Sequence, residues 1–355
     1  MGGGKQHIPL STSVKKSRDS SMELLRIIAM SMILIHHFVV VGTPHKLMTE
    51  GLGFRNSFIF YGVNLFVLIS GYYGIKVRWR SFLSLAITVV FFGLADVSFK
   101  CAIGWYLHGF NASDLLLFRT VLFRPTGMYW FISCYFILYF FAPVINIGLK
   151  NASKIQLRSI VLVALCYCLY AGVVHDYAVA RGYEVPQFIL LYITGYWIKV
   201  DNPFYKISSW WLIAIAISCS VINGSDIFKV IFGQYPGIYY SASYINLFCF
   251  VGSVVIFLMF TRISFHIRFI NSLASASLGC YLLQESHAWY NYIYEFQNRF
   301  FLSHPLCESL LMYAASFVGL WAASWVLTWF KNLWAPKLID AVYRALPRRW
   351  KQAVW

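Results

Sequence analysis

The sequence predicts an all-α membrane protein, a polytopic bundle of about ten transmembrane helices. Hydrophobic residues make up 59% of the 355 residues and charged residues only 12%, with a mean hydropathy of +0.64. A soluble globule of this size could not carry that composition on its surface. Apolar runs of about 17–24 residues also recur along the whole length, which is the length that crosses a bilayer.

Ten such runs can be placed in order, and each is long and apolar enough to predict a helix in the bilayer. The sixth and seventh are the shortest. The predicted helices lie near residues 22–42, 57–75, 82–104, 128–149, 157–176, 186–200, 208–222, 238–260, 271–291 and 309–330.

Two polar ends flank the membrane domain, which is predicted to span residues 21–330. Residues 1–20 are polar and basic, with three consecutive glycines, and are predicted to be a disordered cytoplasmic tail. Residues 331–355 alternate apolar and basic side chains. This pattern predicts an amphipathic helix on the cytoplasmic face of the membrane.

The net charge of +16 follows the membrane topology. If the N-terminus is cytoplasmic, most of the 29 Lys and Arg residues fall in cytoplasmic segments and few fall outside. That asymmetry is the positive-inside rule, and it places both termini in the cytoplasm. The basic residues are therefore expected to meet anionic lipid headgroups, and nucleic acid is not an expected partner.

The eight cysteines carry no metal or disulfide signature. None forms a CxxC pair, and all lie among apolar neighbours. They are expected to pack as small hydrophobic residues, so no metal site is predicted. The chain also shows no internal repeat of the kind found in inverted-repeat transporters.

The first predicted helix contains four ionisable side chains: Glu23, Arg26, His36 and His37. A charged side chain at the bilayer centre costs about 2.5–3.5 kcal/mol, so an idle anchor would not carry them. Eleven residues of helix bring Arg26 and His37 within about 20° of one face and about 16 Å apart along the axis. Glu23 lies near that face, whereas His36 points about 80° away and is expected to be a packing residue.

Glu23, Arg26 and His37 thus form a stripe of ionisable side chains along one helix face. This stripe predicts catalysis, with His37 as the general base. Arg26 is expected to pair with Glu23 or to grip an anionic group such as a phosphate. The structural alternative is a buried ion pair beside a hydrogen-bonded histidine.

The second predicted helix includes Gly62–Tyr72 and descends towards the cytoplasm. Near its inner end Ser70 and Gly71 permit close backbone approach. Three basic residues, Lys76, Arg78 and Arg80, follow at the membrane surface, on the side where Arg26 enters. They are predicted to bind the phosphates of a nucleotide-bearing donor, with ordinary topological charges as the alternative.

Three later segments carry further polar or aromatic candidates. Asp96 and Lys100 are spaced i,i+4, acid first, which predicts an ion pair within one helix. Trp130, in the aromatic start of the fourth helix, is a candidate for stacking on a sugar. Glu285 and His287 lie towards the outer end of the ninth helix and are predicted to line an outward-facing pocket with His37.

These segments, taken in order, resemble the acyltransferase-3 family of integral-membrane O-acyltransferases from bacteria. Glu23, Arg26 and His37 match the family's opening motif, an acidic residue and an arginine followed by a histidine. The stretches Gly62–Tyr72, Tyr129–Tyr139 and Ser277–Leu282 resemble three later motifs. Two departures stand out: Gln284 replaces a histidine that many relatives have, with His287 the possible substitute, and only Arg78-Trp-Arg80 resembles the paired arginines of some relatives.

The resemblance implies transfer of an acyl group, usually acetyl from acetyl-CoA, to a saccharide hydroxyl. It implies a bacterial cytoplasmic (inner) membrane location, His37 as the catalytic residue and Arg26 as its companion. Acyl-CoA and a surface or lipid-linked saccharide are then the expected partners, and no metal is required. The general-base and covalent acyl-histidine routes both stay open, and the sequence specifies neither the sugar nor an oligomeric state.

Two other classes of protein compete with this prediction. A transporter or flippase for a glycan or lipid-linked intermediate could use the buried ionisable groups as a proton relay. It would move its substrate without consuming an acyl donor. A membrane scaffold without activity would tolerate replacement of His37.

Overall fold

The computed structural model describes residues 19–44, 57–109, 129–174, 182–202, 204–225 and 243–347, together with Asn111, Ala112, Leu116, Val121 and Arg349. All regular secondary structure in these residues is helical. The predicted all-α class is therefore confirmed. The tail predicted at residues 1–20 falls almost entirely outside the described residues.

Four helices of the described chain are long and apolar enough to cross a membrane, and three shorter ones are strongly apolar. The figure of ten spans stays a prediction. The long helices are α1 (Ser20–Val40), α5 (Trp79–His108), α7 (Trp130–Asn151) and α16 (Leu306–Ala345), and the shorter ones are α4 (Gly62–Tyr73), α10 (Ser209–Gly224) and α12 (Leu247–Thr261).

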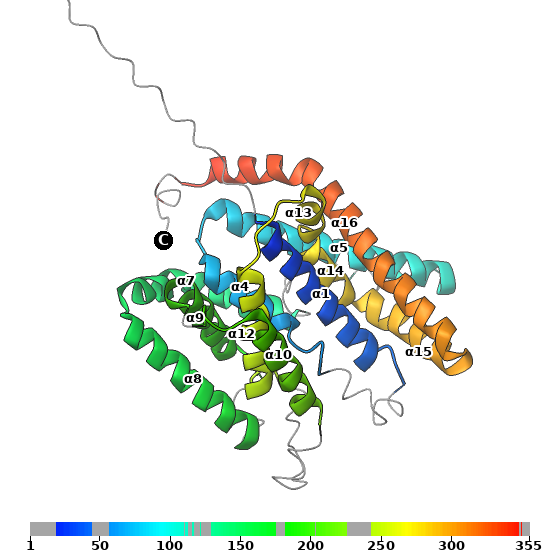
Figure 1. Cartoon of the computed structure of the whole chain (residues 1–355). Helices are drawn as coiled ribbons and strands as arrows, with labels where there is room; N and C mark the ends of the chain where they lie inside the picture. The colour runs from blue at the N-terminus through cyan, green and yellow to red at the C-terminus, as the bar shows by residue number, and fades with distance from the viewer. Residues whose placement is uncertain are drawn as a thin grey trace, which may run out of the picture.

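The remaining helices complete the bundle around α1 and α4. Helices α7, α8 and α9 gather on one side of the molecule, and α5, α15 and α16 lie on the other (Figure 1). Helix α4 packs against α1, α9 and α12. The further elements are α8 (Lys154–Val174), α9 (Val185–Asp201), α13 (Arg268–Ala274), α14 (Ser277–Gln284), the π-helical turn Trp289–Tyr294 and α15 (Glu295–Ser303).

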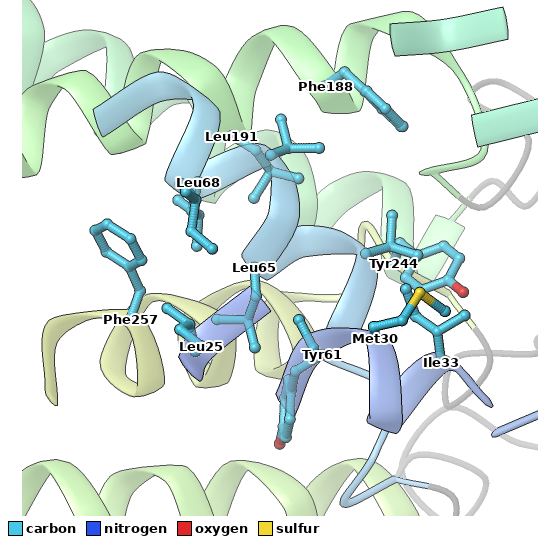
Figure 2. Close-up of a cluster of buried hydrophobic side chains, with 14 of the residues drawn as sticks. Leu25, Met30, Ile33, Tyr61, Leu65, Leu68, Phe188, Leu191, Tyr244 and Phe257 are labelled. Carbon is cyan, nitrogen blue, oxygen red and sulfur yellow. The ribbon is translucent and has the colours of Figure 1, made fainter. Parts of the chain in front are cut away.

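The core forms where α1, α4, α9 and α12 meet. Leu25 of α1, Leu65 and Leu68 of α4, Leu191 of α9 and Phe257 of α12 are all fully buried, and they lie close together in Figure 2. In a bilayer, burial gives little hydrophobic gain, so close van der Waals packing holds such helices together. This core fixes the positions of α1 and its ionisable stripe.

Glycines bring α4 and α9 into backbone contact. A Cβ atom on Gly71 would lie 2.1 Å from the carbonyl oxygen of Tyr192, and one on Gly195 would lie 2.3 Å from that of Leu68. Each glycine therefore faces the backbone of the other helix. The predicted close approach at Gly71 is confirmed.

The outer faces of the bundle are apolar. On α7, Phe140, Phe141, Val144 and Ile147 are exposed, and α16 exposes Trp329 and Phe330 among others. A water-soluble protein rarely exposes such continuous apolar faces, whereas hydrocarbon chains cover them without cost. The faces fit a multi-pass membrane protein.

The single helix predicted at 271–291 is wrong. The chain forms α13, breaks at Ser275–Ala276, forms the short α14 and continues through a π-helical turn. Buried side chains satisfy backbone groups at both breaks: the Ser324 hydroxyl donates to the carbonyl of Ala276 at 2.7 Å, and Asp96 accepts from the backbone at residues 287 and 288. Broken helices at membrane depth need this kind of internal partner.

The last predicted span and the first part of the predicted amphipathic tail, as far as Ala345, form one helix, α16, rather than two. Pro336 lies inside it and cannot donate a backbone hydrogen bond. Figure 1 shows the red C-terminal part of α16 running at an angle to its orange part.

Several chain segments meet at one end of the bundle. The Ser20 hydroxyl at the start of α1 lies 2.8 Å from the Asn271 side chain on α13, and Arg80 at the start of α5 pairs with Asp340 near the end of α16. Figure 1 shows the start of α1, α13 and the red part of α16 on the same side. We call this end of the bundle, which carries Arg80, the basic end.

Candidate active site

His37 and Glu285 form the centre of the site. Nε2 of His37 lies 3.1 Å from Oε1 of Glu285, and the two side chains are 16% and 9% exposed. Helix α1 supplies the histidine, and the residue that ends α14 supplies the carboxylate. The structure therefore brings together two residues that the sequence predicted to line one pocket.

A carboxylate beside an imidazole orients the ring and stabilises its protonated form. Gln284 lies beside the same imidazole. Nδ1 of His37, both amide atoms of Gln284 and Oε1 of Glu285 are buried and make no hydrogen bond of good geometry among the described residues. These atoms are available to a polar ligand at the imidazole.

Glu23 and Arg26 form the predicted ion pair one turn apart on α1. Nη1 of Arg26 donates to Oε1 of Glu23 at 2.5 Å, with Glu23 buried and Arg26 partly exposed. The pair leaves part of the guanidinium facing a cavity.

That cavity has a volume of about 260 Å³ and lies along the stripe below His37. Arg26, Met30 and Ile33 line it from α1 at the i, i+4, i+7 spacing that places His37 one turn further along the same face. Ser277 and Tyr281 line it from α14, and Gln284 and Glu285 follow one turn after Tyr281. We call this space the Arg26 cavity; it extends along the two helix faces that carry the His37–Glu285 pair.

Other walls come from helices α4 and α7, which resemble later motifs of the family. Phe66 and Ser70 contribute from α4, and Phe131 and Tyr135 from α7. The Ser70 hydroxyl donates to the Phe66 carbonyl at 3.0 Å and lies 3.4 Å from the Tyr135 hydroxyl. Segments that are far apart in the sequence therefore enclose one space.

Asp96 holds the segment that follows Glu285, and the predicted Asp96–Lys100 ion pair is wrong. Asp96 is buried, and its two carboxylate oxygens accept from the backbone N–H groups of His287 at 3.2 Å and Ala288 at 2.9 Å. No ion pair joins it to Lys100 in the described part of the chain. Backbone groups freed by the broken helix compete better for a buried carboxylate than a lysine that can reach the membrane surface.

His287 and Trp130 lie apart from the central pair. The His287 side chain is exposed, and only its backbone bonds to Asp96. Trp130 packs in an aromatic cluster, 4.5 Å from Tyr183 and stacked on Tyr244 at 5.8 Å between ring centroids. Tyr244 in turn stacks on Phe60 at 4.3 Å.

His36 joins this aromatic cluster to the central pair. Its ring lies 5.0 Å from that of Phe60 and 5.3 Å from that of His37. Its burial against Phe60 agrees with the packing role predicted for it.

The three predicted donor-binding basic residues do not act as one group. Lys76, Arg78 and Arg80 are all exposed, and of the three Arg80 lines a second cavity, described below. Sequence reasoning missed a further basic residue on that cavity, Lys331, which it assigned to the cytoplasmic tail. The only sequence signal was a lysine at the end of an apolar run.

In the described residues, no three His, Cys, Asp or Glu side chains gather as metal ligands would.

The described helices form a membrane bundle with a buried histidine–carboxylate pair one helical turn beyond the residues that line the Arg26 cavity, which fits a multi-pass membrane protein with an internal polar site. A family model described as an acyltransferase domain, the acyltransferase-3 family, matches residues 19–329. The chain belongs to this family. No curated protein matches it, and no solved structure matches it.

Proposed function

We propose that the protein transfers an acetyl group from acetyl-CoA to a hydroxyl of a surface or lipid-linked saccharide, with His37 as the catalytic residue. The observation that carries the proposal is the 3.1 Å contact between His37 and Glu285, one helical turn beyond the residues that line the Arg26 cavity. Family membership supports acyltransferase activity. The donor, the acceptor and the role of His37 belong to the proposal.

The pair suits an acyl transfer to an alcohol. Nδ1 of neutral His37, whose Nε2 faces Glu285, takes the proton from the acceptor hydroxyl as its oxygen attacks the thioester carbonyl. Glu285 stabilises the imidazolium that forms. The tetrahedral intermediate then expels the CoA thiolate, which takes the proton, and the ester product and free CoA leave.

A covalent route uses the same residues. The imidazole would attack the thioester first, release CoA and pass the acetyl group to the acceptor. The two routes differ in whether CoA is released when no acceptor is present.

Donor and acceptor would approach from opposite ends of the bundle. The basic end, which the positive-inside rule assigns to the cytoplasm, would admit acetyl-CoA past Arg26. The acceptor would reach His37 and Glu285 from the other side, where His287 is exposed. This arrangement corresponds to a bacterial cytoplasmic membrane enzyme with both termini inside.

The cellular test compares O-acetylation of surface glycans by NMR in a deletion strain complemented with three forms of the chain. Wild type should restore the acetyl signal and His37→Ala should not. His304→Ala, which alters an exposed histidine outside the site, is the matched control and should restore it. Full restoration by His37→Ala would contradict the proposal, and a defect in glycan export without loss of acetylation would favour a transporter.

A further inference from the structure

A second cavity, of about 470 Å³, lies between α5, α14 and α16. Its walls are basic and rich in hydroxyl groups. Arg80 and Lys331 supply the charge, and Ser81, Ser84, Thr88 and Thr328 supply hydroxyls. We call it the Lys331 cavity.

Lys331 is unusual in this cavity because a lysine is rarely so buried. The side chain is only 8% exposed, and its Nζ donates to the Thr88 hydroxyl at 2.8 Å. The Thr88 hydroxyl in turn donates to the Ser84 carbonyl at 2.7 Å, so a neutral backbone group ends this chain of hydrogen bonds. In the described part of the chain no carboxylate pairs with Lys331, although an ammonium group has three protons to donate.

A buried cation without an anion is costly, and such residues in membrane proteins mark ligand pathways. Arg80, the other cation of this cavity, does have an anionic partner, because it pairs with Asp340 at 3.0 Å. Arg80 is 58% exposed and also lies over the Tyr343 ring. It therefore stands at the rim of the cavity, with Lys331 inside.

The two cavities are neighbours. Leu85, Ser275 and Leu278 line both of them. A ligand with its anionic part at Lys331 could therefore extend past these residues towards Arg26 and along the α1 stripe to His37. The charge lies at the basic end and the histidine at the far end of this line.

We infer that the Lys331 cavity binds a phosphate group of the acyl donor, with Lys331 as the main cation and Arg80 at the rim. The inference rests on the proposed function, because it takes the donor to be acyl-CoA, whose phosphates and thioester lie at opposite ends of one long molecule. Lys331 then anchors the donor while its thioester reaches His37. Hydroxyl groups and an ammonium suit phosphate oxygens, which accept several hydrogen bonds.

The test measures CoA binding to the purified full-length chain in lipid nanodiscs by calorimetry, without turnover. Lys331→Met keeps the length of the side chain and removes its charge, so its Kd for CoA should rise about 10- to 100-fold. Lys331→Arg should stay within a few-fold of wild type. Lys337→Met, an exposed lysine on the same helix, is the matched control and should bind as wild type does.

Two further measurements keep the result interpretable. Adenosine 3′,5′-bisphosphate, which has phosphates but no thiol arm, should compete with CoA on wild type and lose affinity on Lys331→Met. If Lys331→Met does not fold, Ser84→Leu fills the cavity from an exposed position and should also weaken CoA binding at least tenfold.

An unchanged CoA affinity in Lys331→Met, relative to Lys337→Met, would overturn the inference and leave the proposed function standing. Loss of co-purified lipid phosphorus in Lys331→Met at unchanged CoA affinity would assign the cavity to a lipid headgroup, which also overturns it. Absence of CoA binding by wild type would instead remove the proposed donor and the inference with it.

Discussion

At the residue scale, Glu285 and His37 have different tasks although they are in contact. In the proposed function, the imidazole exchanges protons with the substrates, and the carboxylate only orients and stabilises it. Glu285→Gln keeps the shape and removes the charge. Because an opposite charge this close stabilises the imidazolium that forms in the transition state, its removal should slow acetyl transfer about 10- to 100-fold.

The measurement is kcat and KM for acetyl-CoA with the purified variant. A fall in kcat with unchanged KM would place the effect at the reacting group. Glu308→Gln, an exposed acid on α16, is the control and should leave both constants unchanged. If Glu285→Gln retained the wild-type kcat, the contact would have no role in the reaction.

Asp96 is a positioning residue, because it touches the backbone that follows Glu285 and not His37 itself. Asp96→Asn replaces one acceptor oxygen by a donor facing an N–H group. The loop should shift, and kcat should fall about tenfold with little change in KM for acetyl-CoA.

The control distinguishes this role from a structural ion pair. Lys100→Gln would match Asp96→Asn in its effect if the two residues acted as partners. With the backbone contacts as they are, Lys100→Gln should keep wild-type kcat. Equal losses in the two variants would contradict the positioning role.

The sequence identified the ionisable residues of this site, but local spacing alone did not give all of their contacts. Charged groups in an apolar helix indicate function by their cost alone, so Glu23, Arg26 and His37 could be named. The contact of His37 with Glu285 joins two distant parts of the chain, and periodicity carries no information about it. Asp96 was assigned to Lys100 because only local spacing was visible.

At the element scale, α4 and α9 depend on glycine more than on side-chain burial. Any Cβ on Gly71 would collide with the Tyr192 carbonyl, which cannot move without bending α9. We expect Gly71→Val to destabilise the protein by at least about 1–3 kcal/mol and to lower the yield of folded protein. The yield is measured by fluorescence-detected size exclusion and the stability by thermal melting in detergent.

Gly148 gives the matched control on another helix. A Cβ there would meet nothing within 4 Å, so Gly148→Val should melt near wild type, apart from a small helix-propensity effect. A normal melting temperature for Gly71→Val would mean that α4 and α9 are not in backbone contact.

Long apolar elements were predictable and the broken one was not. Hydropathy locates α1, α5 and α7 because length and composition determine a span. Hydropathy does not predict the breaks before and after α14, because these depend on Ser324 and Asp96 from other helices. For the same reason, the sequence did not predict that α16 continues through Pro336.

At the scale of the whole molecule, the proposed function requires one orientation of the protein in the membrane. Lys76 at the basic end should lie in the cytoplasm, and His304 at the turn before α16 should lie outside. Single cysteines at these positions test the orientation, in a background without the exposed Cys166 and Cys307. An impermeant maleimide applied to intact cells should label His304→Cys and not Lys76→Cys, and the reverse pattern would contradict the topology.

In the proposed function, His37 carries out the transfer of the acyl group of a CoA thioester. Its most direct measurement is acceptor-dependent release of CoA thiol by purified wild type and His37→Ala in nanodiscs, with CoA binding measured in parallel. We predict that His37→Ala binds CoA with wild-type affinity and releases thiol at least about 100-fold more slowly, the loss expected when a general base is removed. Thiol release at the wild-type rate by His37→Ala would contradict the account.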